Sequence, residues 1–138
     1  MVLDQVTKAA VSRALHLGQS LPIFPGIFRL TLVHNTGAAF GLFKNGTLIL
    51  IFVSLFSIAI LPWWGRQLGL SQRSAPMALA WIIGGALGNL IDRLRFGYVV
   101  DFLDFRVWPV FNLADSAIVL GAGWIAWRVW RSPRQGAA

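Results

Sequence analysis

The 138-residue sequence has no cysteine, no glutamate and only five acidic residues. The lack of cysteine excludes a disulfide framework, a thiol nucleophile and a cysteine-ligated metal. Charged residues make up 12% of the chain and hydrophobic residues 57%, whereas soluble domains carry about 25% charged residues. This composition predicts an integral membrane protein with a single domain over residues 1–138.

Acidic residues are scarce but clustered, because four of the five lie between Gly84 and Asp115. A carboxylate beside apolar helices is costly unless it is paired, hydrogen-bonded or protonated, so these residues are functional candidates. The twelve basic residues form no continuous stripe, and the net charge of +7 therefore indicates lipid headgroups rather than nucleic acid as partners.

Three long apolar stretches predict transmembrane helices at residues 47–64, 75–92 and 112–130. Residues 1–17 also form a predicted helix. Asp4, Lys8 and Arg13 interrupt its apolar run, so this helix is too short to span a bilayer as written.

Residues 22–43 have the pattern of a small sheet or hairpin. Apolar and polar residues alternate from Phe28 to Val33, after a turn signal at Pro25-Gly26. We expect this hairpin outside the hydrocarbon, because unpaired strand edges are not tolerated in lipid. Residues 93–111 are predicted to be a charged loop with a turn at Gly97.

The order of the spans puts the hairpin and the charged loop on the same side of the membrane. Asn35, Asp101 and Asp115 can therefore meet. Asn112 is a natural N-cap for the last helix, and Asp115 then occupies its third position.

Other chemistries fit the sequence less well. There is no G-x-S-x-G motif, and hydroxyls such as those of Ser54 and Ser57 in an apolar helix usually bond carbonyls of their own helix. A dyad of Ser12 and Lys8 is possible by spacing. Neither histidine has a second ligand at helical spacing, so we expect no metal and no cofactor.

Two aspartates are the most plausible reactive groups. Carboxyls that share a site cannot both ionise, so one holds a proton while the other activates water. Asp101 and Asp115 are the best pair by position, since one follows the Gly97 turn and the other begins the next helix. The alternative is that Asp115 only stabilises the helix dipole.

The remaining acids have simpler interpretations. Asp92 with Arg93 fits an interfacial ion pair, and Asp104 fits a solvated loop acid. Asp4 and Lys8 lie one helical turn apart and could form an i,i+4 pair, or Asp4 could orient site residues.

Four sequence blocks closely resemble the lipoprotein signal peptidases, also called signal peptidase II. They are LDQVTK (3–8), VHNTGAAFGLF (33–43), GGALGNLIDRLRFGYVVDF (84–102) and FNLADSAI (111–118). The blocks occur in the family's order and extend over nearly the whole chain.

The resemblance implies a mainly α, four-helix transmembrane bundle with an extracytoplasmic β cradle. It implies a monomeric aspartic endopeptidase of the bacterial inner membrane, active near the outer leaflet. Its partners would be membrane lipids and prolipoproteins, which it cuts just before a diacylglyceryl cysteine. By motif, the catalytic pair would be Asp101 and Asp115. The site-lining residues would be Asp4, Lys8, Asn35, Asn89, Arg93 and Asn112.

The sequence departs from the family at its start, where only Met1 and Val2 precede Leu3. Family members have a full first transmembrane helix, so we expect the chain as given to be incomplete. Two alternatives stay open: a small transporter or proton channel that uses membrane-edge aspartates, and a packing subunit built on the glycine face of residues 84–88.

Overall fold

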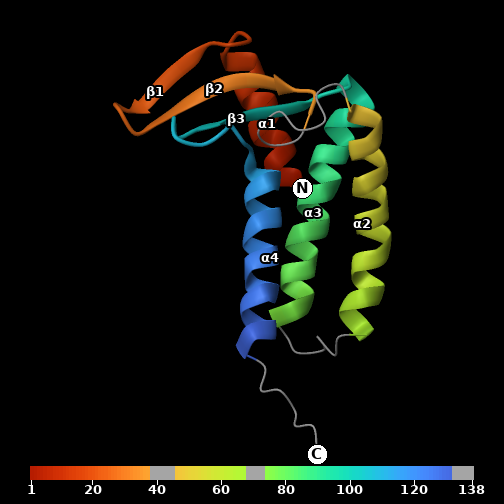
Figure 1. The fold of residues 1–138 in the computed structure, drawn as a ribbon. Helices are drawn as coiled ribbons and strands as arrows, with labels where there is room; N and C mark the ends of the chain where they lie inside the picture. Colours follow the sequence, from red (N-terminus) through yellow and green to blue (C-terminus); the bar gives the residue numbers. More distant parts are fainter. Residues whose placement is uncertain (38–45, 68–73, 132–138) are drawn as a thin grey trace, which may run out of the picture.

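The computed structural model describes residues 1–37, 46–67 and 74–131, which form four helices and a three-stranded antiparallel sheet (Figure 1). The helices are α1 (Val2–Ala14), α2 (Thr47–Gln67), α3 (Ser74–Phe96) and α4 (Leu113–Arg131). The strands are β1 (Ser20–Phe24), β2 (Phe28–Asn35) and β3 (Val99–Asp104). The predicted end of the hairpin at 38–43, the connection at 68–73 between the second and third helices and the C-terminal tail at 132–138 lie outside the described residues.

All four helices lie where the apolar runs predict them, with different ends. α1 ends at Ala14, before the predicted end at residue 17, and α3 continues to Phe96, beyond the predicted end at residue 92. Gly97 ends α3, because its φ of 78° leaves the helical region while its amide still bonds the carbonyl of Arg93 at 3.0 Å. The predicted turn at Gly97 is confirmed.

The segment predicted as a loop at 93–111 contains a strand, so that part of the prediction was wrong. β3 pairs antiparallel with β2 in the order β1-β2-β3, and Val33 lies opposite Asp101. Nearly every residue of β3 is buried. The strand therefore lacks the polar and apolar alternation that marks a half-buried strand in a sequence, and its two aspartates resemble loop residues.

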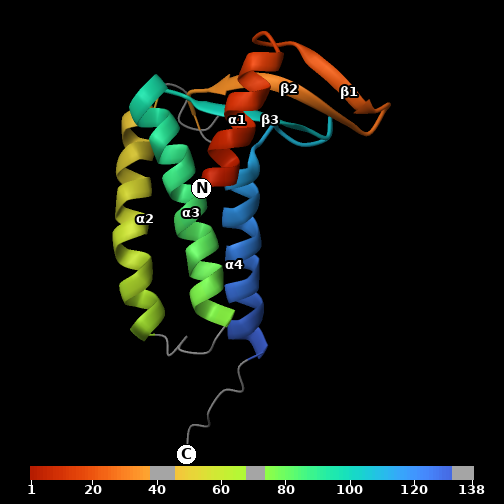
Figure 2. The same ribbon diagram turned by 180° about the vertical axis from the view of Figure 1, so that it is seen from behind.

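The sheet lies at one end of the helices, and the C-terminal end of α4 lies at the other (Figures 1 and 2). α3 runs between α2 and α4 and packs against both, whereas α1 packs beside the sheet, α3 and α4. The hairpin and the acidic segment thus share one end of the molecule, as the order of the helices predicts.

Large apolar side chains cover the outside of the helices. Phe52, Phe56 and Leu120 are each more than 60% exposed, while a small buried cluster of Leu15, Leu32 and Val100 lies beside the sheet. Among the described residues, one helical stretch, Pro76–Phe96, is long and apolar enough to cross a membrane. Thr47–Trp63 is apolar but shorter. One of the three predicted spans therefore meets this criterion.

Glycines of α3 allow close helix packing, as their pattern predicts. A Cβ on Gly85 would collide with the carbonyl oxygen of Ala114 and come within 2.8 Å of Ile118, and a Cβ on Gly88 would come within 2.6 Å of the Asp4 carboxylate. α3 therefore approaches both α1 and the start of α4 closely. This approach brings the polar residues at 89 and 92 beside those of the other two helices.

Candidate active site

The first turn of α4 is built by reciprocal hydrogen bonds between Asn112 and Asp115. The amide of Asp115 donates to Oδ1 of Asn112 at 2.9 Å, and the amide of Asn112 donates to Oδ2 of Asp115 at 3.3 Å. This is the geometry of a capping box. The predicted N-cap is confirmed. Asp4 adds a third contact from α1, because its Oδ1 accepts the amide of Ala114 at 2.9 Å.

Asp101 lies on β3, with 2% of its surface exposed. The pairing of β2 with β3 brings Asn35 beside it, and Nδ2 of Asn35 donates to Oδ2 of Asp101 at 2.8 Å. Nδ2 of Asn112 donates to the other oxygen, Oδ1, at 2.6 Å. The Asp101 carboxyl is thus held on both oxygens by side-chain amides.

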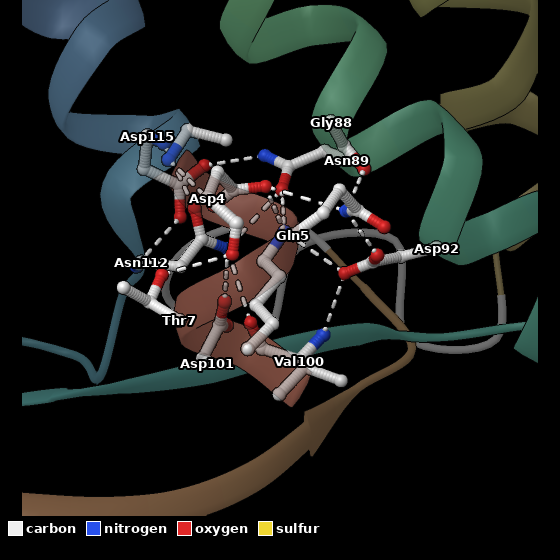
Figure 3. A network of polar contacts seen from close by, with 12 residues as sticks. Asp4, Gln5, Thr7, Gly88, Asn89, Asp92, Val100, Asp101, Asn112 and Asp115 are labelled. Atoms are coloured by element: carbon white, nitrogen blue, oxygen red, sulfur yellow. Dashed lines mark hydrogen bonds and ion pairs between the residues drawn. The ribbon is translucent and has the colours of Figure 1, made fainter. Parts of the chain in front are cut away.

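A second asparagine completes the link between the two candidate acids (Figure 3). Asn89, on α3, donates from Nδ2 to Oδ1 of Asp115 at 2.7 Å, and its Oδ1 accepts from Nδ2 of Asn112 at 3.1 Å. Asp101 and Asp115 come from different elements, but the same two amide side chains connect them. The prediction that Asn35, Asp101 and Asp115 can meet is confirmed.

The environment of Asp101 favours its protonated form. Burial raises the pKa of Asp101 to about 7, and the negative charge of Asp115 adds to this rise. Hydrogen bonds from Asn35 and Asn112 and the charge of Lys8 act in the opposite direction without outweighing these causes. Asp101 can therefore hold a proton near neutral pH.

Lys8 lies behind the asparagines and is buried. Its Nζ is 3.0 Å from Oδ2 of Asp4, 2.8 Å from Oδ2 of Asp92 and 2.9 Å from Oδ1 of Asn89. The predicted pair of Asp4 and Lys8 is present, but both side chains are almost fully enclosed. This single cation compensates two carboxylates and orients the amide of Asn89.

Asp92 does not form the predicted interfacial pair with Arg93, so that interpretation was wrong. It is 1% exposed, and besides Lys8 it accepts hydrogen bonds from Nε2 of Gln5 at 2.8 Å and from the amide of Val100 at 3.1 Å. Asp92 therefore joins α3 to α1 and to the strand that carries Asp101. Gln5 was missed, and its only sequence signal is its place in the LDQVTK block.

Asp104 is not a solvated loop acid, which corrects a second prediction. It lies opposite Arg29 in the sheet register and is 3% exposed. Its Oδ2 accepts from Nε of Arg29 at 2.6 Å and from the hydroxyl of Thr31 at 2.8 Å. Burial acts to raise the pKa of Asp104, but these bonds and the amide of Arg106 outweigh it and lower the pKa. Asp104 therefore stabilises the sheet as an ionised cross-strand partner.

Arg93 is the remaining predicted site residue. Its Nη2 donates weakly to the carbonyl of Gly37 at 3.4 Å, while its Nε is buried and has no hydrogen-bond partner among the described residues. Arg93 lines the same cavity as Asp101 and Asp115. A buried guanidinium nitrogen without a partner is costly, so this donor is available to a polar group that enters the cavity.

The cavity has a volume of about 880 Å³ and runs from the aspartates along α2, α3 and α4. Its polar end holds Asn35, Asn89, Asp101 and Asp115, and apolar side chains such as Leu61 and Leu120 line the rest. Within the described residues, no group of three or more histidine or acidic side chains is arranged to hold a metal ion. The chemistry available here is that of two carboxyls, which can activate water, surrounded by amide donors.

Two solved structures of bacterial membrane enzymes have the same fold. One superposes with a TM-score of 0.87 at 26% identity and covers 99% of this chain and 88% of its own. The other has a TM-score of 0.80 at 27% identity, with 95% and 87% covered. The chain therefore has the fold of a bacterial membrane enzyme, with two linked aspartates in its cavity.

The family follows from the sequence comparisons. The model of the family described as Signal peptidase (SPase) II matches residues 1–131. A lipoprotein signal peptidase of Moorella thermoacetica is 47% identical over 129 residues, 94% of this chain and 86% of the relative. A lipoprotein signal peptidase of Halothermothrix orenii is 44% identical over 137 residues, which cover 99% of this chain and 93% of the relative. The chain belongs to the signal peptidase II family, and its activity is removal of signal peptides from prolipoproteins.

Proposed function

We propose that Asp101 and Asp115 are the catalytic pair and that they share one proton. The observation that carries this proposal is that Asn112 contacts both residues. Its side-chain amide nitrogen donates to the Asp101 carboxyl, its backbone amide donates to the Asp115 carboxyl, and its side-chain oxygen accepts from the backbone amide of Asp115. Asp101 is the better proton holder because burial and the charge of Asp115 raise its pKa to about 7. Asp115, at the positive end of a helix dipole, is the better base.

In the proposed reaction, the Asp115 carboxylate removes a proton from water while protonated Asp101 donates to the carbonyl oxygen of the scissile bond. The water oxygen bonds to the carbonyl carbon and forms a tetrahedral intermediate. Asp115 then gives its proton to the amide nitrogen, the C–N bond breaks, and Asp101 recovers its proton from the collapsing diol. General acid and base catalysis of this kind contributes about 10²–10⁴-fold for each group.

The supporting residues have distinct proposed roles. Asn35, Asn89 and Asn112 fix the carboxyls through the bonds described above, and Lys8 with Asp4 anchors Asn89 and the start of α4. The Nε of Arg93, which has no hydrogen-bond partner among residues 1–37, 46–67 and 74–131, is a donor for a substrate carbonyl. An extended substrate near lipid needs such donors, because its backbone has no water to bond.

We propose that the cut falls just before a cysteine that carries diacylglycerol. The apolar part of the cavity suits the signal segment, and the acyl chains would lie between the protein and the bilayer. This agrees with the exposed apolar surface of α2 and α4 beside the cavity. The partners are then prolipoproteins and membrane lipids, with no nucleic acid.

We further propose that residues 1–138 form one multi-pass domain in the bacterial inner membrane, with the sheet on the outer side. Trp124, Trp127 and Trp130 near the far end of α4, followed by Arg131, support an interfacial belt there. The ends of the helices that carry Asp115 and Asn89 would then lie near the outer leaflet. We also propose a monomer, because the hydrogen bonds that link Asp101 to Asp115 are complete without a residue from a second chain.

The test is to make Asp101→Asn and Asp115→Asn separately and to follow cleavage of a synthetic diacylated prolipoprotein peptide. Each variant should lose about 10²–10⁴-fold in kcat. Asp104→Asn is the matched control, because Asp104 lies on the same strand but bonds Arg29, and it should retain activity.

A wild-type rate for Asp101→Asn or Asp115→Asn, in correctly inserted protein, would remove that residue from the catalytic pair. The alternative function, a small transporter or proton channel, would show flux in vesicles without any cleavage. The family match favours the peptidase over that alternative.

A further inference from the structure

Three serines line the apolar cavity, and one of them has an unused hydroxyl. Ser54 donates to the carbonyl of Leu50 at 2.8 Å, and Ser116 donates to the carbonyl of Asn112 at 3.0 Å. Ser57 lines the same cavity but makes no hydrogen bond with any described residue. The expectation that such hydroxyls bond their own helix is thus met by Ser54 and not by Ser57.

The depth of Ser57 can be compared with that of the catalytic end of the cavity. The hydroxyl of Thr47 bonds the carbonyl of Gly97 at 2.9 Å, so the start of α2 and the end of α3 lie at one level. At 1.5 Å per residue, Ser57 lies about 15 Å below that level and Asn89 about 12 Å below it. Ser57 is therefore about 3 Å, or roughly half a helical turn, deeper than the amide that bonds Asp115.

A peptide that reaches the aspartates from within the bilayer must unwind before it is cut, because a helical carbonyl is not accessible to the attacking water. Unwinding leaves backbone carbonyls without partners in an apolar groove, which is costly. Below Asn89, the lining residues are almost entirely apolar, and the hydroxyls of Ser54 and Ser116 are already bonded. Ser57 is the one serine of the described lining with a free donor at this depth.

We propose that the Ser57 hydroxyl donates a hydrogen bond to a backbone carbonyl of the signal segment, a few residues before the scissile bond. The proposal rests on the proposed function of the aspartates. Ser57 takes no part in the chemical step. It holds the unwound segment in register with Asp101 and Asp115 and acts as a binding residue for the signal peptide.

The first test compares Ser57→Ala with Ser54→Ala, using steady-state cleavage of a synthetic diacylated prolipoprotein peptide in detergent micelles. Ser57→Ala should lower kcat/KM by about 2–13-fold, the range that a neutral hydrogen bond gives. The loss should appear mainly in KM, because the bond is present in both ground and transition states. Ser54→Ala should match the wild type, and Ser57→Thr, which keeps the hydroxyl, should recover most of the loss.

The second test identifies the substrate group. Each of the four amide bonds before the cut is replaced in turn by an ester, whose carbonyl is a weaker acceptor. At one position, the ratio of kcat/KM between the wild type and Ser57→Ala should fall towards one. The proposal is overturned if no ester changes that ratio and a peptide with an ether-linked dialkylglyceryl cysteine brings the ratio to one instead. The Ser57 hydroxyl would then bond the lipid ester and not the peptide backbone.

Wild-type kinetics of Ser57→Ala would also overturn the inference. The outcome would leave the proposed function intact as long as Asp101→Asn is inactive in the same assay. Full activity of Asp101→Asn would overturn the function itself, so the two failures are distinguishable.

Discussion

Asn112 and Asp115 exchange two backbone-to-side-chain hydrogen bonds, and the side-chain amide nitrogen of the same Asn112 lies 2.6 Å from the Asp101 carboxyl. Capping of α4 and alignment of the two acids therefore use one residue. A change at Asn112 should alter helix stability and acid geometry together, and a suitable substitution can separate them.

Asn112→Ser should separate the cap from the amide link. Serine caps a helix about as well as asparagine, but it has no amide nitrogen to donate to Asp101. We expect kcat to fall by about 10²-fold, the cost of a misplaced catalytic group. Cleavage of the diacylated peptide and thermal unfolding in micelles measure the two effects.

Asn112→Ala is the companion variant, because it removes both the cap and the amide. Its kcat should equal that of Asn112→Ser, while its free energy of unfolding should be lower by about 1 kcal/mol. A wild-type kcat in Asn112→Ser would show that the amide does not align Asp101.

The pH dependence of cleavage should follow the proton on Asp101. The folded-state pKa is raised to about 7, so Asp101 is protonated below that pH and ionised above it. If Asp101 is the acid, kcat/KM should fall as the pH rises above about 7, since both carboxyls are then charged. A pH profile of single-turnover cleavage between pH 5 and 9 measures this loss.

The same raised pKa makes a prediction about stability. A folded state that binds this proton more tightly than the unfolded chain is stabilised at low pH, and that contribution is lost as the pH rises towards 7. Asp101→Asn should reduce this part of the pH dependence of unfolding.

Asp115→Asn should lower the pKa of Asp101, because it removes a neighbouring negative charge, and infrared titration of the protonated carboxyl would detect the change.

Local sequence features predicted much of the fold and part of the site. Long apolar runs located α2, α3 and α4, and the scarcity of acid directed attention to Asp101 and Asp115. The N-cap at Asn112 could be predicted because capping depends on residues within one turn. The turn at Gly97 depends on a single residue that tolerates positive φ.

Long-range pairings could not be predicted in this way. Asp92 was assigned to its neighbour Arg93, but its charged partner, Lys8, is on α1, and Asp104 pairs with Arg29 across the sheet. Both pairings depend on how helices and strands approach one another, which no local pattern contains. β3 was missed for a related reason, since its burial is created by the other elements around it.

Lys8→Met should destabilise the fold strongly. It would leave Asp4 and Asp92 buried without their shared cation, and breaking a buried ion pair from one side costs about 3–5 kcal/mol. Chemical unfolding in micelles measures the effect. Adding Asp92→Asn should restore part of the loss, because it removes one uncompensated charge.

Arg13→Met is the control for Lys8→Met, since Arg13 is an exposed cation on the same helix. Its effect should lie within about 0.5 kcal/mol of the wild type. Equal effects of the two substitutions would mean that the buried cluster contributes no more than a surface charge.

The glycine face of α3 gives a matched pair of variants. A Cβ at Gly85 would collide with the carbonyl oxygen of Ala114 and lie 2.8 Å from Ile118, whereas a Cβ at Gly84 would meet only the Met1 nitrogen at 3.7 Å. Gly85→Ala should therefore cost about 1–3 kcal/mol through overpacking. Gly84→Ala should be neutral or stabilising by up to about 1 kcal/mol, because alanine favours a helix.

Gly84→Ala and Gly85→Ala also test whether the close packing of α3 against α4 is needed to align the site. Pushing α3 away from Ala114 at Gly85 would also shift Asn89, which lies one turn further along α3 and bonds Asp115. Gly85→Ala should therefore lower kcat as well as the unfolding temperature, while Gly84→Ala should leave kcat unchanged. If Gly85→Ala lost stability but kept full kcat, the close approach of α3 and α4 would matter for folding alone, and the alignment of Asp115 would depend on its own turn.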